Sequence, residues 1–139
     1  MDHFLSVKSR PDLTYEWSNY RFAAHELNAC KKNADAAVLD PYEVGAGWFE
    51  IRLPSLQLLA TDLVPKALRA KAEYTLVRLG LRDGERVLRA RRRWLELYEK
   101  GELTFEGLLR CAPLIAQAVR VQKATASAKR LDLKRNQKP

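Results

Sequence analysis

The segment Asn19–Lys31, with the sequence NYRFAAHELNACK, decides the fold of the N-terminal part of this chain. Residues 20–32 are rich in Ala, Glu, Leu and Lys, and they predict a turn followed by a short helix. This helix is expected to stop before Pro41, because the residue that precedes a proline is pushed out of the α region. Polar residues are spaced along the same part of the chain, in the order Asp2, His3, Asn19, Asn28, Lys31 and Asp40.

These polar residues suit the hydrolysis of a phosphodiester beside a metal ion. A carboxylate and an amide oxygen can both bind a hard divalent cation such as Mg²⁺. A histidine beside that ion can take a proton from water at neutral pH, and the ion stabilises the scissile phosphate and its leaving oxygen. Asp2 and His3 are adjacent, so on a strand they would face opposite sides. One of them must therefore lie at a bulge or a strand end if both serve one site.

The same residues resemble the HNH nucleases, the ββα-metal endonucleases. The family motif reads Asp/Glu-His, a loop, and then Asn-Leu-x-x-x-Cys-x-x-Cys-Asn-x-x-Lys. Here the pair Asp2-His3 precedes Asn19, and the spacing from Asn19 through Asn28 to Lys31 matches without a gap. The resemblance covers about residues 2–40. Further likeness to the branch found with bacterial defence systems lies in Lys8-Ser9, Pro11-x-Leu13 and Tyr15-x-Trp17-x-Asn19-Tyr20.

The resemblance implies a small HNH-like ββα unit. The alternation of polar and apolar residues over residues 48–53 separately predicts one extra strand, so residues 1–60 are expected to be α+β. His3 would act as the general base that activates water, and Asn19 would tie down the loop and orient His3. Asp2 and Asn28 would hold a single Mg²⁺ or Mn²⁺ ion, and Lys31 or Lys32 would lie near the substrate backbone. The implied activity is metal-dependent cleavage of DNA. The implied partners are DNA and, through the defence-associated branch, a protein of a defence or mobile-element system.

The chain departs from the family pattern in two places. The two cysteines of the motif fall on Ala24 and Leu27, so no structural zinc is expected and apolar packing must replace it. The family normally has residues before the Asp-His pair, whereas only Met1 precedes Asp2 here, so a short first strand is expected. Two interpretations stay open: a protein that begins further upstream, or a trimmed and catalytically degenerate module that binds DNA or a partner.

Residues 61–124 predict a helical region. The first helix can begin at Thr61 or Asp62 and end at Gly80, and the second runs from Asp83 to Gly101. The third begins at Thr104, and Pro113 should break or kink it. Residues 125–139 are polar and basic and predict a frayed, flexible tail. The three tryptophans, Trp17, Trp48 and Trp94, are expected in the core.

Charge is distributed unevenly along the sequence. The chain has 25 Lys and Arg against 17 Asp and Glu, a net charge of +8. Residues 1–60 hold 6 basic against 8 acidic side chains, a net of −2, and residues 61–139 hold 19 against 9, a net of +10. This division favours a polyanionic partner for the second part. Arg89, Arg92 and Arg93 share one helix face, which is either a solvated face paired with Glu85 and Glu96 or a phosphate-binding ridge.

Other classes of protein find little support. No apolar run approaches the ~20 residues that span a bilayer, and the N-terminus lacks the features of a secretory signal, so a cytoplasmic protein is expected. The two cysteines, Cys30 and Cys111, are too few for a disulfide scaffold. The sequence has no P-loop, GxGxxG, GxSxG or HExxH motif.

Overall fold

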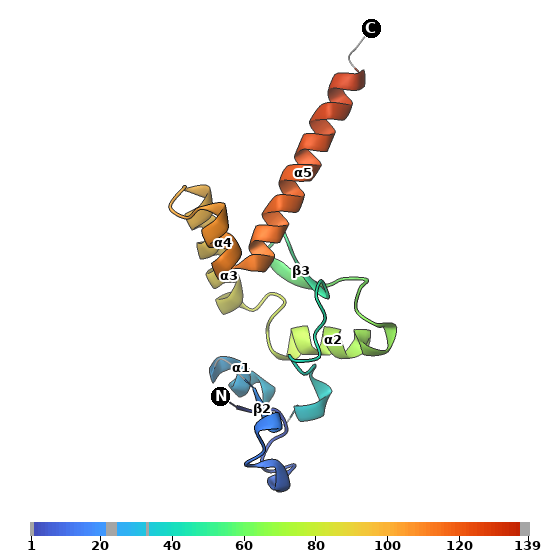
Figure 1. Cartoon of the computed structure of the whole chain (residues 1–139), viewed down its shortest axis with the longest axis vertical. Coiled ribbons are helices and arrows are strands. Elements are labelled where there is room, and N and C mark those ends of the chain that lie inside the picture. Colours follow the sequence, from blue (N-terminus) through green and yellow to red (C-terminus); the bar gives the residue numbers. More distant parts are fainter. Residues whose placement is uncertain (1, 22–24, 33, 137–139) are drawn as a thin grey trace. The chain divides into compact units, whose positions relative to one another are not determined.

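The computed structural model describes residues 2–21, 25–32 and 34–136, apart from the side chains of residues 2, 25, 26, 28, 36 and 131–136 (Figure 1). The described chain is α+β, with helices and two small two-stranded sheets. It divides into two compact units, and neither is continuous in sequence. Unit 1 comprises residues 1–49 and 58–84, and unit 2 comprises residues 50–57 and 85–139.

Unit 1 begins with a strand–loop–strand–helix segment. Strand β1 (Asp2–His3) pairs antiparallel with β2 (Tyr20–Arg21), with Asp2 opposite Arg21 and His3 opposite Tyr20. The connecting loop contains the 3₁₀ helices η1 (Pro11–Leu13) and η2 (Trp17–Asn19). Helix α1 (His25–Lys31) follows, and Lys32 after it adopts φ +48°, the left-handed conformation that ends many helices. The predicted short helix and the two strands of the ββα order are therefore present, but the helix ends at Lys31 and not at the predicted stop before Pro41.

Helix α2 (Lys66–Arg78) supplies much of the apolar core of unit 1. Ala72 and Leu76 are almost completely buried, and the neighbouring cluster of apolar residues includes Leu39 and Val64. The short 3₁₀ helix η3 (Asp35–Ala37) leads into this cluster, where the Leu39 N–H donates to Thr75 Oγ1 at 2.8 Å. The bond joins the segment after α1 to α2 and satisfies a buried polar pair.

The start of α2 differs from the prediction and its end agrees. The helix begins at Lys66 rather than near Thr61, because Pro65 has the extended ψ of 137° that belongs to a helix N-cap. Thr61 caps a turn instead, since its Oγ1 accepts from the Leu63 N–H at 3.2 Å. Gly80 has φ +62°, which a glycine adopts without steric cost, and it follows Leu79, the C-cap of α2.

The second sheet has two strands. Strands β3 (Phe49–Arg52) and β4 (Gln57–Ala60) are neighbours in the second sheet. The alternation of residues 48–53 predicted β3 correctly, and Ile51 is its buried residue. The sequence analysis missed β4, because its run of Gln, Leu, Leu and Ala lacks β-branched residues and alternation.

Unit 2 is mainly helical, with α3 (Glu85–Glu99), α4 (Phe105–Cys111) and α5 (Pro113–Asn136). Thr104 caps α4 as predicted, since its Oγ1 accepts from the Gly107 N–H at 3.1 Å. The predicted break at Pro113 is also present, because α4 ends at Cys111 and α5 begins at Pro113. The buried side chains of Leu108 and Ile115 connect the two helices.

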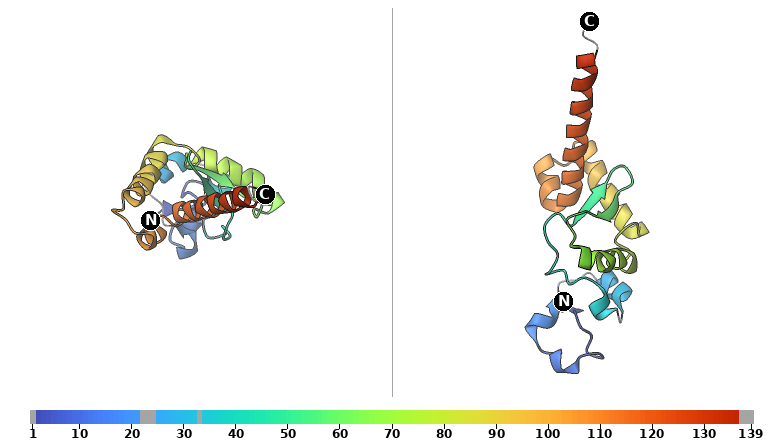
Figure 2. Two further views of the ribbon diagram at one scale, coloured as in Figure 1. Left: turned by 90° about the horizontal axis from the view of Figure 1, so that it is seen from above. Right: turned by 90° about the vertical axis from the view of Figure 1, so that its right-hand side faces the viewer.

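The C-terminal stretch continues α5 instead of fraying at Thr125. The last turns of α5, through Asn136, extend away from the other helices of unit 2 in the side views (Figure 1 and the right panel of Figure 2). Every residue from 121 to 130 is exposed. Lys123 still contacts α3, where its Nζ donates to the Tyr98 hydroxyl at 2.5 Å, and the turns beyond it rest mainly on their own backbone hydrogen bonds. Among the described residues, no helix has the length and apolar character that a membrane crossing requires.

Candidate active site

Asn19 closes the loop between β1 and β2. Its side chain is 5% exposed, and its Oδ1 accepts from the Leu5 N–H at 2.8 Å. Its Nδ2 donates to the carbonyl oxygens of Leu5, at 3.0 Å, and of Leu13, at 3.3 Å. The main chain adds a bond from the Phe4 N–H to the Asn19 carbonyl at 2.7 Å. One amide therefore holds both ends of the loop, and all its donors are used.

The ring of His3 is held by the same loop. Its Nε2 lies 2.9 Å from the carbonyl oxygen of Thr14, the residue that follows Leu13. Because a carbonyl can only accept, Nε2 carries the proton, and in the neutral ring the lone pair lies on Nδ1. The Tyr20 hydroxyl donates to the same carbonyl at 2.7 Å, and the rings of Tyr20 and His3 lie 4.6 Å apart. The imidazole is thereby fixed in a tautomer that can accept a proton at Nδ1.

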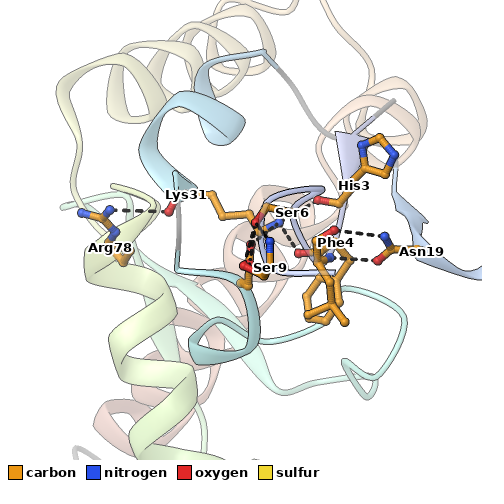
Figure 3. Close-up of polar contacts among 9 residues, drawn as sticks. His3, Phe4, Ser6, Ser9, Asn19, Lys31 and Arg78 are labelled. Carbon is orange, nitrogen blue, oxygen red and sulfur yellow. Dashed lines mark hydrogen bonds and ion pairs between the residues drawn. The ribbon is translucent and has the colours of Figure 1, made fainter. Parts of the chain in front are cut away.

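Lys31 binds the main chain at His3 and Phe4 (Figure 3). Its Nζ donates to the His3 carbonyl at 2.8 Å and to the Phe4 carbonyl, while the His3 ring points away from Lys31. Lys31 Nζ also lies 3.7 Å from Asp35 Oδ1. The ammonium group thus ties α1 to the end of β1. Lys32 is exposed, and its contact with a substrate stays a prediction, as does that of Lys31.

Asp35 anchors the start of the loop. The hydroxyls of Ser6 and Ser9 both donate to its Oδ2, at 2.9 and 2.7 Å. Burial raises the pKa of this carboxyl, but the two hydroxyls and Lys31 outweigh burial and hold the pKa below its ordinary value. The carboxylate consequently stays charged at neutral pH and joins η3 to the loop.

Arg21 and Asp40 form a second buried connection in unit 1. Arg21 Nε donates to Asp40 Oδ1 at 2.7 Å, its Nη2 pairs with Asp40 Oδ2, and each side chain is 11% exposed. Arg21 Nη1 donates to the carbonyls of Ser18 and Tyr20, and its guanidinium lies 4.2 Å from the centre of the Tyr42 ring. The hydrogen bonds from Arg21 lower the pKa of Asp40 below its ordinary value.

The predicted metal ligands lie on adjoining elements of the ββα segment. Asp2 is the first described residue of β1, a strand end, and Asn28 lies within α1. Their side chains lie outside the described part of the structure, so their convergence with His3 stays a prediction, as does the packing expected at Ala24. Among the side chains that are described, no three His, Cys, Asp or Glu groups gather as a metal site would require. The carboxylate of Asp2 and the amide oxygen of Asn28 are the type of ligand that Mg²⁺ and Mn²⁺ prefer.

Unit 1 contains a cavity of about 340 Å³ beside the site, lined by His3, Arg21, Lys31 and many apolar residues such as Leu39 and Leu76. The two cations in this lining already have oxygen partners within the protein. The cavity is therefore suited to apolar groups and poorly suited to phosphate.

The predicted arginine ridge is exposed on α3. Arg89, Arg92 and Arg93 are all exposed, and Arg89 forms an i,i+4 pair with Glu85. Arg91 differs, because it donates to the Leu56 carbonyl at 2.9 Å and burial lowers its pKa. The charge of the two units also differs. Unit 1 has 10 Lys and Arg against 10 Asp and Glu, a net of zero, whereas unit 2 has 15 against 7, a net of +8.

Sequence reasoning missed two functional features of this site. The Thr14 carbonyl that holds His3 is a main-chain group, and no residue type marks it. Trp17, expected in the core, is 78% exposed. The spacing of Tyr20 three residues after Trp17 predicts that the two rings lie on the same side, but no pattern in the sequence predicts that Trp17 is exposed.

We predict that Asn19→Ala lowers the free energy of unfolding by about 2 kcal/mol, because the Leu5 N–H loses its acceptor in a buried position. Urea titration followed by circular dichroism measures the change. Ser18→Ala is the matched control, because Ser18 precedes Asn19 and its side chain is exposed. This substitution should change the free energy of unfolding by less than about 0.5 kcal/mol. Equal stability of the two variants would contradict the role of Asn19.

We predict that Asp40→Asn costs about 3 kcal/mol at pH 7, because it leaves the guanidinium of Arg21 buried without its counter-charge. The folded pKa of Asp40 is lowered, so its contribution is complete above its unfolded pKa of about 3.9 and is lost as pH falls through the folded pKa. Unfolding curves of wild type and variant at several pH values between neutral and acid should therefore converge in acid. Asp12→Asn, which removes the exposed pair with Arg10, should give no measurable difference. A difference for Asp40→Asn that stays constant with pH would refute this assignment.

Comparison with known proteins gives no relative for this chain. No protein-family model, no curated protein and no solved structure matches it. The resemblance to the HNH nucleases thus rests on the residues of the motif, and its function follows as a proposal.

Proposed function

We propose that this protein is a metal-dependent endonuclease of the HNH type that hydrolyses DNA phosphodiester bonds. The observation that carries the proposal is the hydrogen bond from His3 Nε2 to the Thr14 carbonyl. It leaves Nδ1 as the acceptor of a proton, which is what a general base requires. The loop that supplies this carbonyl is closed by Asn19, the middle residue of the motif.

The described residues would divide the work of the reaction. Nδ1 of His3 takes a proton from the attacking water, while the Nε2–H stays hydrogen-bonded to the Thr14 carbonyl. Asn19 and Tyr20 keep that carbonyl and the ring in place, and Lys31 fixes the main chain of His3. Such positioning matters because a small misplacement of a catalytic group costs a large part of the rate.

Asp2 and Asn28 are the residues that would hold the divalent ion. When bound, the ion supplies charge stabilisation for the phosphate and its leaving oxygen. The location of Asp2 at a strand end agrees with the requirement that Asp2 and His3 serve the same site. The protein itself contributes the base, its orientation and the ligands.

DNA is the proposed substrate because of the charge of unit 2. Its net charge of +8, with Arg89, Arg92 and Arg93 exposed on α3, suits the phosphate backbone. The alternative function is that of a degenerate HNH-like module that binds DNA or a partner protein without cleaving it. The same charge favours this alternative, so cleavage and binding need separate tests.

We predict that His3→Ala abolishes Mg²⁺- or Mn²⁺-dependent nicking of a supercoiled plasmid, because the water loses its base. Agarose gels measure nicking, and gel shift with the same plasmid should show binding unchanged. His25→Ala is the matched control, since it removes the other of the two histidines, and it should nick normally. Nicking by purified His3→Ala at the wild-type rate would overturn the assignment. Binding without nicking by the wild type would favour the non-catalytic alternative.

We predict that Arg92→Ala with Arg93→Ala weakens DNA binding and reduces the slope of log affinity against log salt by about 2, one for each lost phosphate contact. Fluorescence anisotropy with a labelled duplex over a salt series measures both. The variant with lysine at both positions keeps the charge and should keep most of the slope. Wild-type affinity and slope in the alanine variant would show that α3 is a solvated face.

A further inference from the structure

Trp17 is an unusually exposed tryptophan beside the candidate base. Its side chain is 78% exposed, and Tyr15, two residues earlier, is 90% exposed. A tryptophan normally buries a large apolar area, so this position leaves a broad ring face in water. The segment Thr14–Tyr20 contains Glu16 and no Lys or Arg. What it can offer a ligand is therefore aromatic surface and not positive charge.

The Trp17 ring belongs to a fixed row of three rings. The centres of the Trp17 and Tyr20 rings lie 5.6 Å apart, and those of Tyr20 and His3 lie 4.6 Å apart. Tyr20 and His3 are both anchored on the Thr14 carbonyl, and η2, which carries Trp17, ends at the buried Asn19. The exposed ring therefore sits at a set distance from the imidazole, on a loop that its hydrogen bonds make rigid.

We propose that Trp17 is a stacking platform for an unpaired nucleobase, so that the substrate of this site is single-stranded or locally unpaired DNA. The proposal rests on the proposed nuclease function. A base whose own strand passes His3 can stack on Trp17 only if the base is out of a duplex stack, since a paired base has both faces covered. Aromatic side chains bind unpaired bases in this way without sequence preference, because every base has a π-face.

Other features of the molecule are less suited to bind an unpaired nucleobase. The cavity beside His3 is lined mostly by apolar side chains, and its cations are engaged within the protein. Residues 121–130 of α5 are exposed and include basic side chains, but they include no aromatic residue on which a base could stack. Trp17 differs because it combines exposure, rigidity and proximity to a group with a free acceptor nitrogen.

The test is binding without cleavage, measured in EDTA with a dye-labelled single-stranded 20-mer and with its blunt duplex. Trp17→Ala should weaken binding of the single strand about tenfold and change duplex binding by less than about twofold. Trp17→Phe should retain most of the single-strand affinity. Tyr74→Ala is the matched control, because Tyr74 is a partly exposed aromatic residue of the same unit on α2, and it should bind as wild type does.

A second readout covers the case in which Trp17→Ala fails to fold. The single strand should quench the tryptophan emission of the wild type, and the quench should be lost in Trp17→Phe, since Trp48 and Trp94 are half-buried. Full quench in Trp17→Phe, unchanged single-strand affinity in folded Trp17→Ala, or equal weakening of duplex binding would each overturn the proposal while leaving the nuclease function intact.

Binding through Trp17 can also be present when the nuclease activity is absent. Trp17-dependent binding of the single strand, with no cleavage by the wild type in Mg²⁺ or Mn²⁺, would support stacking and refute hydrolysis. A wild-type protein that binds neither oligonucleotide would overturn both.

Discussion

The amide of Asn19 is the interaction on which the candidate site depends. A loop that connects two strands of two residues each has little sheet to hold it, so its order must come from hydrogen bonds of its side chains and of neighbouring elements. Ordering each loop residue costs on the order of 1–2 kcal/mol of backbone entropy. Asn19 offsets part of this cost by satisfying three main-chain groups from opposite sides of the loop at once. A shorter polar side chain could not reach both sides.

The position of His3 follows from this closure. Leu13, whose carbonyl Asn19 holds, is followed by Thr14, whose carbonyl receives both His3 and Tyr20. Lys31 completes the arrangement from α1 by binding the main chain of His3 itself. Connected polar groups of this kind strengthen one another and exclude alternative geometries. The arrangement therefore suits a base that must keep one tautomer, and the same connection explains why the ring row from His3 to Trp17 is rigid.

The sequence predicted those features that depend on residue type at a local position. Gly80, Thr104 and Pro113 act where expected, because a positive φ, a capping hydroxyl and a missing N–H are properties of single residues. The exposure of Trp17 could not be predicted, since burial depends on what folds over a side chain. The polarity of the residues after Thr125 predicts a frayed tail, but the structure continues α5 there, because alanine and lysine have high intrinsic helix propensity. The hydrogen bonds from Lys31 to the His3 and Phe4 carbonyls could not be predicted either, because these acceptors lie far from Lys31 along the chain.

The division of charge also changes once the fold is known. Along the sequence the boundary falls near residue 60 and leaves the first part at −2, but in space α2 joins the N-terminal segment and brings that unit to zero. The cations nearest His3, those of Arg21 and Lys31, are occupied by carbonyl and carboxylate oxygens. A phosphate at the site would thus gain little attraction from the side chains that surround it. Under the proposed function, affinity for DNA would come from unit 2, from a bound ion or from uncharged contacts. The exposed ring of Trp17, which contacts Tyr20 next to the candidate base, offers a contact of the last kind.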